Sequence, residues 1–326
     1  MDDIVLDVRH VSKTFPVKTG MFSNSAGVVH AVTDVSFNVR RGETFGLVGE
    51  SGCGKSTLSR TLLRLVSANN GEVYFNGQDI LHVSESEMRK LRIGMRMVFQ
   101  KPFNSLNPRQ TVRQIIAAPF EVHKKFSCQE KEKQVLSLMD RVGLSQSYLD
   151  RYPHEFSGGQ RQRIGIARAL ALQPELIICD EPVSALDVSI QAQILNLLKD
   201  LQQEFNLTYI FISHNLSVVK HMSDRIAVMY LGSIVEIADS QGLYKHARHP
   251  YTQALLSAIP SMDEADRRER IVLKGEIPSP VDLPTGCSFH TRCNHVMECC
   301  RKHQPDFRSM EDGSRVACFL YEEGGR

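Results

Sequence analysis

The stretch Gly49-Glu50-Ser51-Gly52-Cys53-Gly54-Lys55-Ser56, followed by Thr57, decides the fold. It matches the phosphate-loop pattern G-x-x-x-x-G-K-[ST] at every position. A short apolar run over 44–48 precedes it, and apolar residues at helical spacing follow over 58–65. Strand, glycine-rich loop and helix are the order that this motif requires. The sequence therefore predicts a site for the phosphates of a nucleotide.

The glycines and the lysine of this loop have separate tasks. Glycines let consecutive backbone N–H groups turn toward one point with no Cβ in the way, and the helix that follows adds its positive end. Lys55 is predicted to reach the β- and γ-phosphates, and the Ser56 hydroxyl to ligate Mg²⁺. A glycine-rich turn that matches by chance is the alternative, and the flanking strand and helix disfavour it. The predicted cradle comprises Gly49, Ser51, Gly52, Cys53, Gly54, Lys55, Ser56 and Thr57.

Length and composition bound the class of protein. A chain of 326 residues has room for one large domain and a smaller one, and an apolar fraction of 42% is ordinary for a globular protein. A net charge of +2 without a long basic run disfavours nucleic acid as a partner. No segment approaches about 18 uninterrupted apolar residues, and the N-terminus lacks a signal-peptide core. We therefore expect a cytosolic chain with no membrane span.

The pattern of apolar runs predicts an α/β fold. Runs at 44–48, 176–179 and 209–213 alternate with helical patterns such as 191–205, which is typical of a mainly parallel sheet. A second group of strands is expected at 4–8, 31–39 and 71–77, and the last of them is closed by an Asn-Gly turn. This second group predicts an antiparallel sheet beside the nucleotide core.

Two acidic residues end the buried run at 176–179. Asp180 is predicted to hold Mg²⁺ through water, and Glu181 to polarise the water that attacks the γ-phosphate. Two adjacent acids alone are often only a solvated turn. With a phosphate loop upstream, the catalytic reading is favoured.

The stretch Phe156-Ser157-Gly158-Gly159-Gln160 resembles the signature LSGGQ of the ATP-binding-cassette (ABC) ATPases, with Phe156 in place of the leading Leu. Ser-Gly-Gly opens a helix, so unpaired N–H groups and a positive helix end face outward. The resemblance implies that these groups bind the γ-phosphate of an ATP held by a second subunit. A simple helix cap by Ser157 is the alternative.

The resemblance to ABC ATPases covers residues 4 to about 240 and implies a role for each matching residue. Phe15 matches the aromatic that stacks on adenine, although a core position is the alternative. Gln100 matches the glutamine that touches Mg²⁺ and senses the membrane partner. Residues 184–187, which end at Asp187, match the loop that crosses the dimer interface. His214 matches the switch histidine at the γ-phosphate.

One residue departs from this pattern. Asn215 follows the switch histidine where the family commonly has Asp. The catalytic set Lys55, Glu181 and His214 is intact, so we expect hydrolysis of ATP.

Other segments narrow the resemblance to the ATPases of the oligopeptide/dipeptide/nickel importers. Residues 100–109, QKPFNSLNPR, resemble their long glutamine loop, and 248–256, RHPYTQALL, resemble the start of their C-terminal extension. The insert at 16–29 is also similar to an insert in these importer ATPases. The expected domains are a nucleotide-binding domain over 1–240, with a helical subdomain at about 101–165, and an extension over 241–326.

Five of the eight cysteines lie in the last forty residues of the chain. Because disulfides are rare in a reducing cytosol, such a cluster indicates metal binding. The resemblance implies a four-iron four-sulfur cluster on Cys287, Cys293, Cys300 and Cys318, with Cys299 as the spare or as a competitor of Cys300. Zinc on four thiolates and free packing thiols are the alternatives. The histidines among these cysteines are expected to be surface residues.

The function expected from the resemblance is an ATP-hydrolysing subunit of a dipeptide or oligopeptide importer, peripheral on the cytoplasmic face of the cell membrane. Its expected partners are a second ATPase subunit, identical or different, two membrane permeases and an extracytoplasmic peptide-binding protein. A soluble ABC ATPase acting on DNA or ribosomes is the alternative from another class. Nickel, antimicrobial peptides and haem remain open as cargo.

Overall fold

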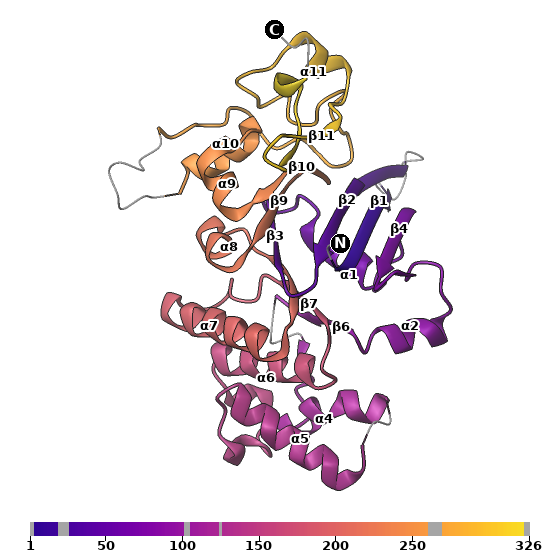
Figure 1. Cartoon of the computed structure of the whole chain (residues 1–326), viewed down its shortest axis with the longest axis vertical. Coiled ribbons are helices and arrows are strands. Elements are labelled where there is room, and N and C mark those ends of the chain that lie inside the picture. Colours follow the sequence, from indigo (N-terminus) through magenta and orange to yellow (C-terminus); the bar gives the residue numbers. More distant parts are fainter. Residues whose placement is uncertain (1–2, 19–25, 101–104, 124–125, 260–268, 323–326) are drawn as a thin grey trace. The chain divides into compact units, whose positions relative to one another are not determined.

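The computed structural model describes residues 3–18, 26–100, 105–123, 126–259 and 269–322. The chain divides into two compact units, each built from several segments (Figure 1). The signature unit comprises Met1–Val5, Val39–Glu43 and His82–Ile212, and the phosphate-loop unit comprises Leu6–Asn38, Thr44–Leu81 and Ser213–Arg326. The division near residue 240 therefore stays a prediction.

Parallel strands form the centre of the signature unit. Strand β7 (Leu176–Asp180) pairs in parallel with β6 (Met95–Val98) and with β8 (Thr208–Ile212). Every residue of β7 and β8 is buried. Strands covered on both faces read as continuous apolar runs, which is why the sequence located them without an alternating pattern.

Four described helices of the signature unit begin with reciprocal caps. A Ser or Thr side chain accepts a backbone N–H three residues on, and the Glu or Gln there accepts the N–H of the cap residue. This capping box opens α2 (Glu85–Leu91), α4 (Val112–Val122), α5 (Cys128–Arg141) and α6 (Gly158–Leu170). Helices α4, α5 and α6 lie side by side in Figure 1 and contact one another. The unit also contains η1 (Gln146–Tyr148), η2 (Pro153–Glu155) and α7 (Val188–Phe205).

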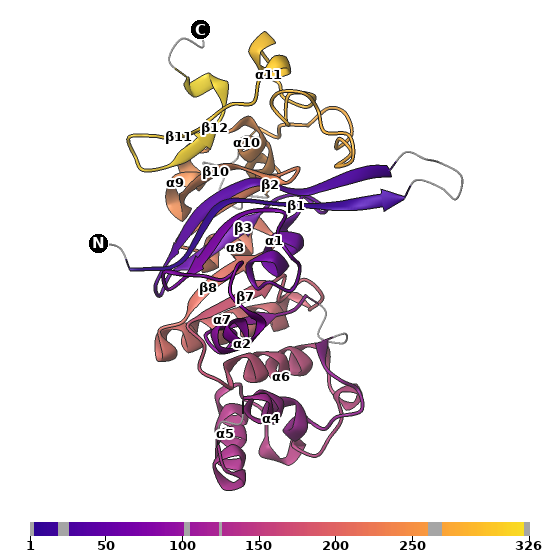
Figure 2. The ribbon, with the colours of Figure 1, turned by 90° about the vertical axis from the view of Figure 1, so that its right-hand side faces the viewer.

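An antiparallel sheet lies in the phosphate-loop unit, as predicted. Its order is β2 (Ala26–Arg40), β1 (Ile4–Lys18), β4 (Asn70–Phe75) and β5 (Gln78–Asp79), and Figure 2 shows β1 and β2 as long neighbouring strands. Strand β4 runs antiparallel to both β1 and β5. The turn between β4 and β5 is the predicted Asn76-Gly77, whose two residues have φ values of 49° and 78°.

The second sheet of this unit mixes directions. Strand β3 (Thr44–Val48) pairs in parallel with β9 (Arg225–Tyr230). The next strands, β10 (Ser233–Asp239), β12 (Arg315–Ala317) and β11 (Phe307–Ser309), are antiparallel. The sheet is therefore less parallel than expected, because Leu231 and Gly232, with φ values of 43° and 87°, turn β9 directly back into β10.

Short helices complete the phosphate-loop unit: α1 (Lys55–Leu62), α8 (Leu216–Met222), α9 (Ser240–His246), α10 (Pro250–Ser257), α11 (Glu298–Lys302) and η4 (Phe319–Tyr321). Three buried rings join the C-terminal residues to β9. The ring centroid of Tyr230 lies 4.6 Å from that of Tyr251 and 5.2 Å from that of Phe289. Burial of three large aromatic side chains anchors this part of the chain firmly.

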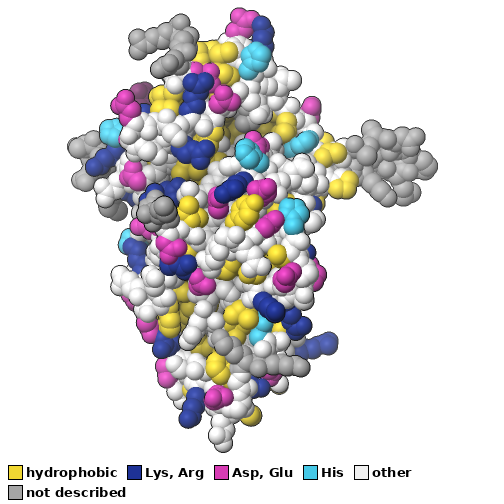
Figure 3. Space-filling view, turned by 45° about the vertical axis from the view of Figure 1, so that its right-hand side comes forward, with side chains coloured by type: hydrophobic (Ala, Val, Ile, Leu, Met, Phe, Trp, Pro, Cys, Tyr) yellow, Lys and Arg dark blue, Asp and Glu magenta, His cyan; other side chains and the backbone are white. Residues whose placement is uncertain are grey.

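The charge of one face of the molecule and the hydropathy of its described helices are both unexceptional. On the face in Figure 3, cationic and anionic side chains are interspersed rather than gathered by sign. Among the residues that the structure describes, no helix is long and apolar enough to span a bilayer.

Candidate nucleotide site and cysteine cavity

The phosphate loop connects β3 to α1. Gly54 has a φ of 106°, and a Cβ there would lie 2.0 Å from the carbonyl oxygen of Ala31, so the position requires glycine. The Nζ atom of Lys55 donates hydrogen bonds to the carbonyl oxygens of Gly49 at 2.8 Å and Glu50 at 2.9 Å. These bonds fix the ammonium group inside the loop, where the sequence predicts the phosphates.

Two further predicted residues of the phosphate-loop unit are exposed. Phe15 on β1 is 36% exposed, and the Nζ atom of Lys13 lies 4.9 Å from its ring centroid, which disfavours a core role. His214 is exposed directly before α8. Asn215 caps that helix, since its Oδ1 accepts the N–H of Val218 at 3.3 Å. Asn caps a helix about as well as Asp, so the departure from the family pattern preserves the local fold.

In the signature unit, the structure brings Gln100 and Glu181 together. The Nε2 atom of Gln100 donates to Oε2 of Glu181 at 2.7 Å. Glu181 has a φ of 47°, in the left-handed region that glutamate rarely adopts. Such strain at the end of β7 fixes the direction of one side chain, a feature common at catalytic positions. Asp180, the preceding residue, is only 2% exposed.

The signature and the 184–187 segment share an exposed region of the same unit. The Oγ atom of Ser157 accepts the N–H of Gln160, and Oε1 of Gln160 accepts the N–H of Ser157. A Cβ on Gly159 would lie 2.5 Å from Cγ2 of Ile190, so α6 and α7 approach closely where both begin. Val188, beside Asp187, is 82% exposed.

The predicted site residues thus fall into two sets. The phosphate loop, Phe15 and His214 belong to one unit, and Gln100, Asp180, Glu181, the signature and Asp187 belong to the other. The predicted Mg²⁺ ligands Ser56, Gln100 and Asp180 are divided between the units, so their joint role stays a prediction. Residues 101–104 of the glutamine loop, and Gly20, Met21 and Phe22 of the insert, lie outside the described residues.

The sequence analysis missed two residues that contact the phosphate loop. The Oη atom of Tyr251 accepts the N–H of Glu50 at 3.0 Å. The guanidinium of Arg292 donates to the carboxylate of Glu50 through two bonds, of 2.9 and 3.2 Å. Tyr251 lies in the segment 248–256 that resembles the start of the importers' C-terminal extension. No local pattern marks Arg292, which lies between Cys287 and Cys293, two of the predicted cluster cysteines.

The four predicted cluster cysteines line one cavity, while the spare Cys299 does not. The sulfurs of Cys293 and Cys300 accept the N–H groups of His295 at 3.3 Å and Met297 at 3.4 Å. Burial raises the pKa of Cys287 to about 11 and that of Cys318 to about 12. Among the described residues, no three His, Cys, Asp or Glu side chains are close enough to hold a single metal ion.

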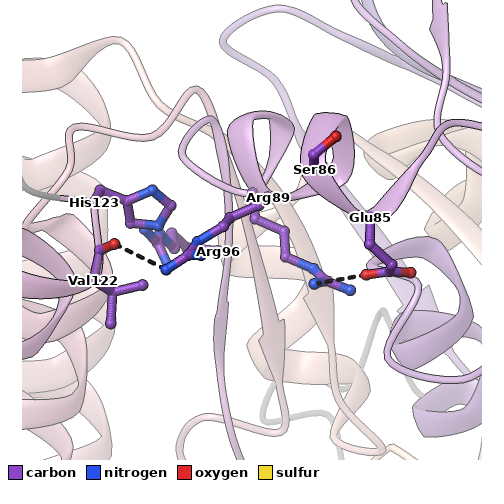
Figure 4. Close-up of a pocket in the computed structure, with 7 residues that line it drawn as sticks. Glu85, Ser86, Arg89, Arg96, Val122 and His123 are labelled. Atoms are coloured by element: carbon purple, nitrogen blue, oxygen red, sulfur yellow. Dashed lines mark hydrogen bonds and ion pairs between the residues drawn. The ribbon is translucent and has the colours of Figure 1, made fainter.

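A basic cleft of about 540 Å³ lies in the signature unit between α2, β6 and the end of α4 (Figure 4). Arg89 donates to the carbonyl oxygen of Val122 at 3.1 Å, and Arg92 lies 3.9 Å from the carboxylate of Glu85. Arg96 also lines the cleft, and burial lowers its pKa. Arg96 lies on strand β6, which ends two residues before Gln100. The cleft is therefore close in the sequence to the glutamine loop at 100–109.

Two family models match the chain. The ABC transporter model matches residues 32–184, and the model of the oligopeptide/dipeptide transporter C-terminal region matches residues 235–300. The oligopeptide transport ATP-binding protein AppF of Bacillus subtilis is 55% identical over 322 residues, 98% of each chain. The dipeptide transport ATP-binding protein DppF of Escherichia coli is 49% identical over 319 residues, which cover 98% of this chain and 95% of that protein.

Solved structures agree on the fold. The dimeric, post-hydrolysis structure of the ATP-binding cassette MJ0796 bound to ADP and Pi matches with a TM-score of 0.64 and 29% identity, covering 72% of this chain and 98% of that chain. The fold is therefore that of an ABC ATPase. Because the similarity to AppF and DppF spans nearly the whole of each protein, the chain belongs to the ATP-binding subunits of the oligopeptide and dipeptide ABC transporters.

Proposed function

We propose that this chain hydrolyses ATP to power the import of dipeptides or short oligopeptides through separate permease subunits, from the cytoplasmic face of the cell membrane. The observation that carries this proposal is the match to the oligopeptide/dipeptide C-terminal region on a chain whose cassette keeps Lys55 and Glu181. ATP hydrolysis coupled to transport is the activity of this family of cassettes. The relatives AppF and DppF are oligopeptide and dipeptide transport ATP-binding proteins, which supports peptides as the cargo.

Each site residue of the cassette has its own role in ATP binding or hydrolysis. Lys55 holds the phosphates, and Glu181 polarises the attacking water while its hydrogen bond from Gln100 orients it. Ser56, Gln100 and Asp180 supply oxygen ligands of the kind that Mg²⁺ prefers. His214 contacts the γ-phosphate, and Phe15 stacks on adenine.

A second ATPase subunit completes each site. Ser157, Gly158, Gly159 and Gln160 of one chain face the ATP of the other, since the start of α6 presents N–H groups and a positive helix end. ATP contacts close the pair, and hydrolysis releases it.

The basic cleft offers a docking place for a protein partner. Its arginines line one concave site, and strand β6, which contributes Arg96, leads in the sequence to Gln100. We place the cytoplasmic end of a permease in this cleft, with acidic or carbonyl groups toward the arginines. The permeases and an extracytoplasmic peptide-binding protein would then choose the cargo.

We propose that the cysteine cavity holds a four-iron four-sulfur cluster, with zinc on the same thiolates as the alternative. Buried thiols with raised pKa values are neutral at pH 7, and a metal would deprotonate them outright. N–H groups directed at the sulfurs stabilise thiolates, as is common around such clusters. All four thiols line one cavity, so the fold brings the four candidate ligands together. Cys287, Cys293, Cys300 and Cys318 would hold the cluster.

Deleting the gene for this chain is expected to abolish uptake of a labelled dipeptide by the source cells. The wild-type chain should restore uptake, and the Glu181→Gln chain should not, because both carry the same permease surface and differ in hydrolysis. Uptake of a free amino acid serves as the control. Unchanged dipeptide uptake, with loss of nickel or haem uptake instead, would contradict the proposed cargo.

A further inference from the structure

The second residue of the phosphate loop is held at three points. The N–H of Glu50 is bound by Tyr251, its carbonyl oxygen accepts from Lys55, and its carboxylate is bound at both oxygens by Arg292. Tyr251 and Arg292 belong to the C-terminal part of the chain, and the pattern G-x-x-x-x-G-K-[ST] leaves the residue at Glu50 open. The cassette motifs therefore do not account for these contacts.

The pair between Arg292 and Glu50 is largely shielded from water. The Arg292 side chain is 8% exposed and that of Glu50 is 24% exposed. The guanidinium carbon of Arg292 lies 5.9 Å from the ring centroid of Tyr230. Burial alone would lower the pKa of Arg292, but the hydrogen bonds and charge of Glu50 raise it above the usual range. A two-bond arginine–carboxylate pair in such surroundings fixes both groups in place.

An unpaired carboxylate at Glu50 would oppose ATP binding. The triphosphate carries several negative charges, and a carboxylate within the loop that cradles it repels them, all the more where water is excluded. Arg292 cancels that charge. Arg292 also restrains the side chain of the residue whose carbonyl oxygen accepts the hydrogen bond from the ammonium group of Lys55.

We propose that Arg292 is a positioning residue of the ATP site, which acts through Glu50 and tunes the affinity of the loop for ATP. It neutralises the Glu50 carboxylate and restrains the side chain of that residue, whose carbonyl oxygen accepts from Lys55. The C-terminal part of the chain thereby completes the phosphate loop of its own cassette. This inference rests on ATP binding by the loop and is independent of what the cysteine cavity holds.

Four variants test this role: Arg292→Gln, Arg292→Lys, Glu50→Gln and the double variant Glu50→Gln/Arg292→Gln. Binding of Mg·ATP to the full chain is measured by titration calorimetry, and kcat and KM are measured in the assembled transporter. For Arg292→Gln we expect Kd and KM to rise about tenfold or more, because truncation leaves a partly buried carboxylate unpaired. We expect kcat to stay within about threefold of wild type, because Arg292 does not touch the reacting atoms.

The double variant separates neutralisation from packing. Removing both charges should return KM to within about threefold of wild type, and Arg292→Lys, which keeps the charge without the two-bond geometry, should be intermediate. Arg301→Gln, at an exposed arginine on α11, is the matched control and should leave KM unchanged.

A folded Arg292→Gln chain with wild-type KM would overturn the proposal. A double variant no better than Arg292→Gln would overturn neutralisation as the mechanism. If thermal unfolding shows that Arg292→Gln does not fold, Arg292→Lys and the double variant carry the test. Wild-type chain that fails to bind Mg·ATP would instead contradict the nucleotide site itself.

Discussion

Glu181→Gln is expected to lower steady-state ATP hydrolysis by about 10²–10⁴-fold, the usual contribution of a general base, while ATP binding persists. The amide cannot take the proton of the attacking water. It has nearly the shape of the carboxylate and keeps an oxygen that can accept the bond from Nε2 of Gln100. The loss should therefore appear in kcat, measured as phosphate release from the assembled transporter, and not in the Kd for Mg·ATP.

A matched carboxylate in the same unit controls for charge. Glu175 precedes β7 and is paired with Arg41 at 2.5 Å, away from the end of the strand where Glu181 lies. Glu175→Gln should hydrolyse ATP at close to the wild-type rate. Near-normal hydrolysis by Glu181→Gln would refute its assignment as the catalytic base.

The second large effect concerns metal. Protein purified without oxygen is expected to be brown and to contain about four iron atoms per chain, as a four-iron four-sulfur cluster requires. Cys318→Ser should lose most of this iron, because it removes one of the four sulfurs that line the cavity. Metal analysis by mass spectrometry and the visible absorption spectrum measure both quantities.

Cys299 supplies the control for the cysteine cavity. It neighbours Cys300 in the sequence but does not line the cavity, so Cys299→Ser should keep its iron and colour. Colourless wild-type protein with one zinc per chain would establish zinc instead. Protein purified without oxygen that holds neither metal would leave the thiols as packing residues.

The sequence predicted features that local chemistry determines. The phosphate loop, the signature and the Ser157 cap of α6 each depend on residues a few positions apart, so their patterns are visible in a single sequence. The buried strands β7 and β8 were also predictable, because burial on both faces demands continuous apolar runs.

Features that depend on distant residues were not predicted. Arg292 and Glu50 are 242 positions apart, and an arginine on a surface and one in a buried ion pair look alike in sequence. Strand β10 was missed because Leu231, an apolar residue with positive φ, opens the turn before it in place of the usual Asn, Asp or Gly. The spacing of the cysteines indicated the set, but only the fold brings Cys318 to the other three.

The measurement that bears most directly on peptide import uses the transporter reconstituted in lipid vesicles from this chain, its partner subunits and the peptide-binding protein. ATP hydrolysis is measured with the binding protein empty and loaded with a dipeptide. We expect loading to raise the rate by about fivefold or more, and the labelled dipeptide to accumulate only with ATP. Equal rates in both states, or a rate raised by DNA or ribosomes instead, would contradict a peptide importer.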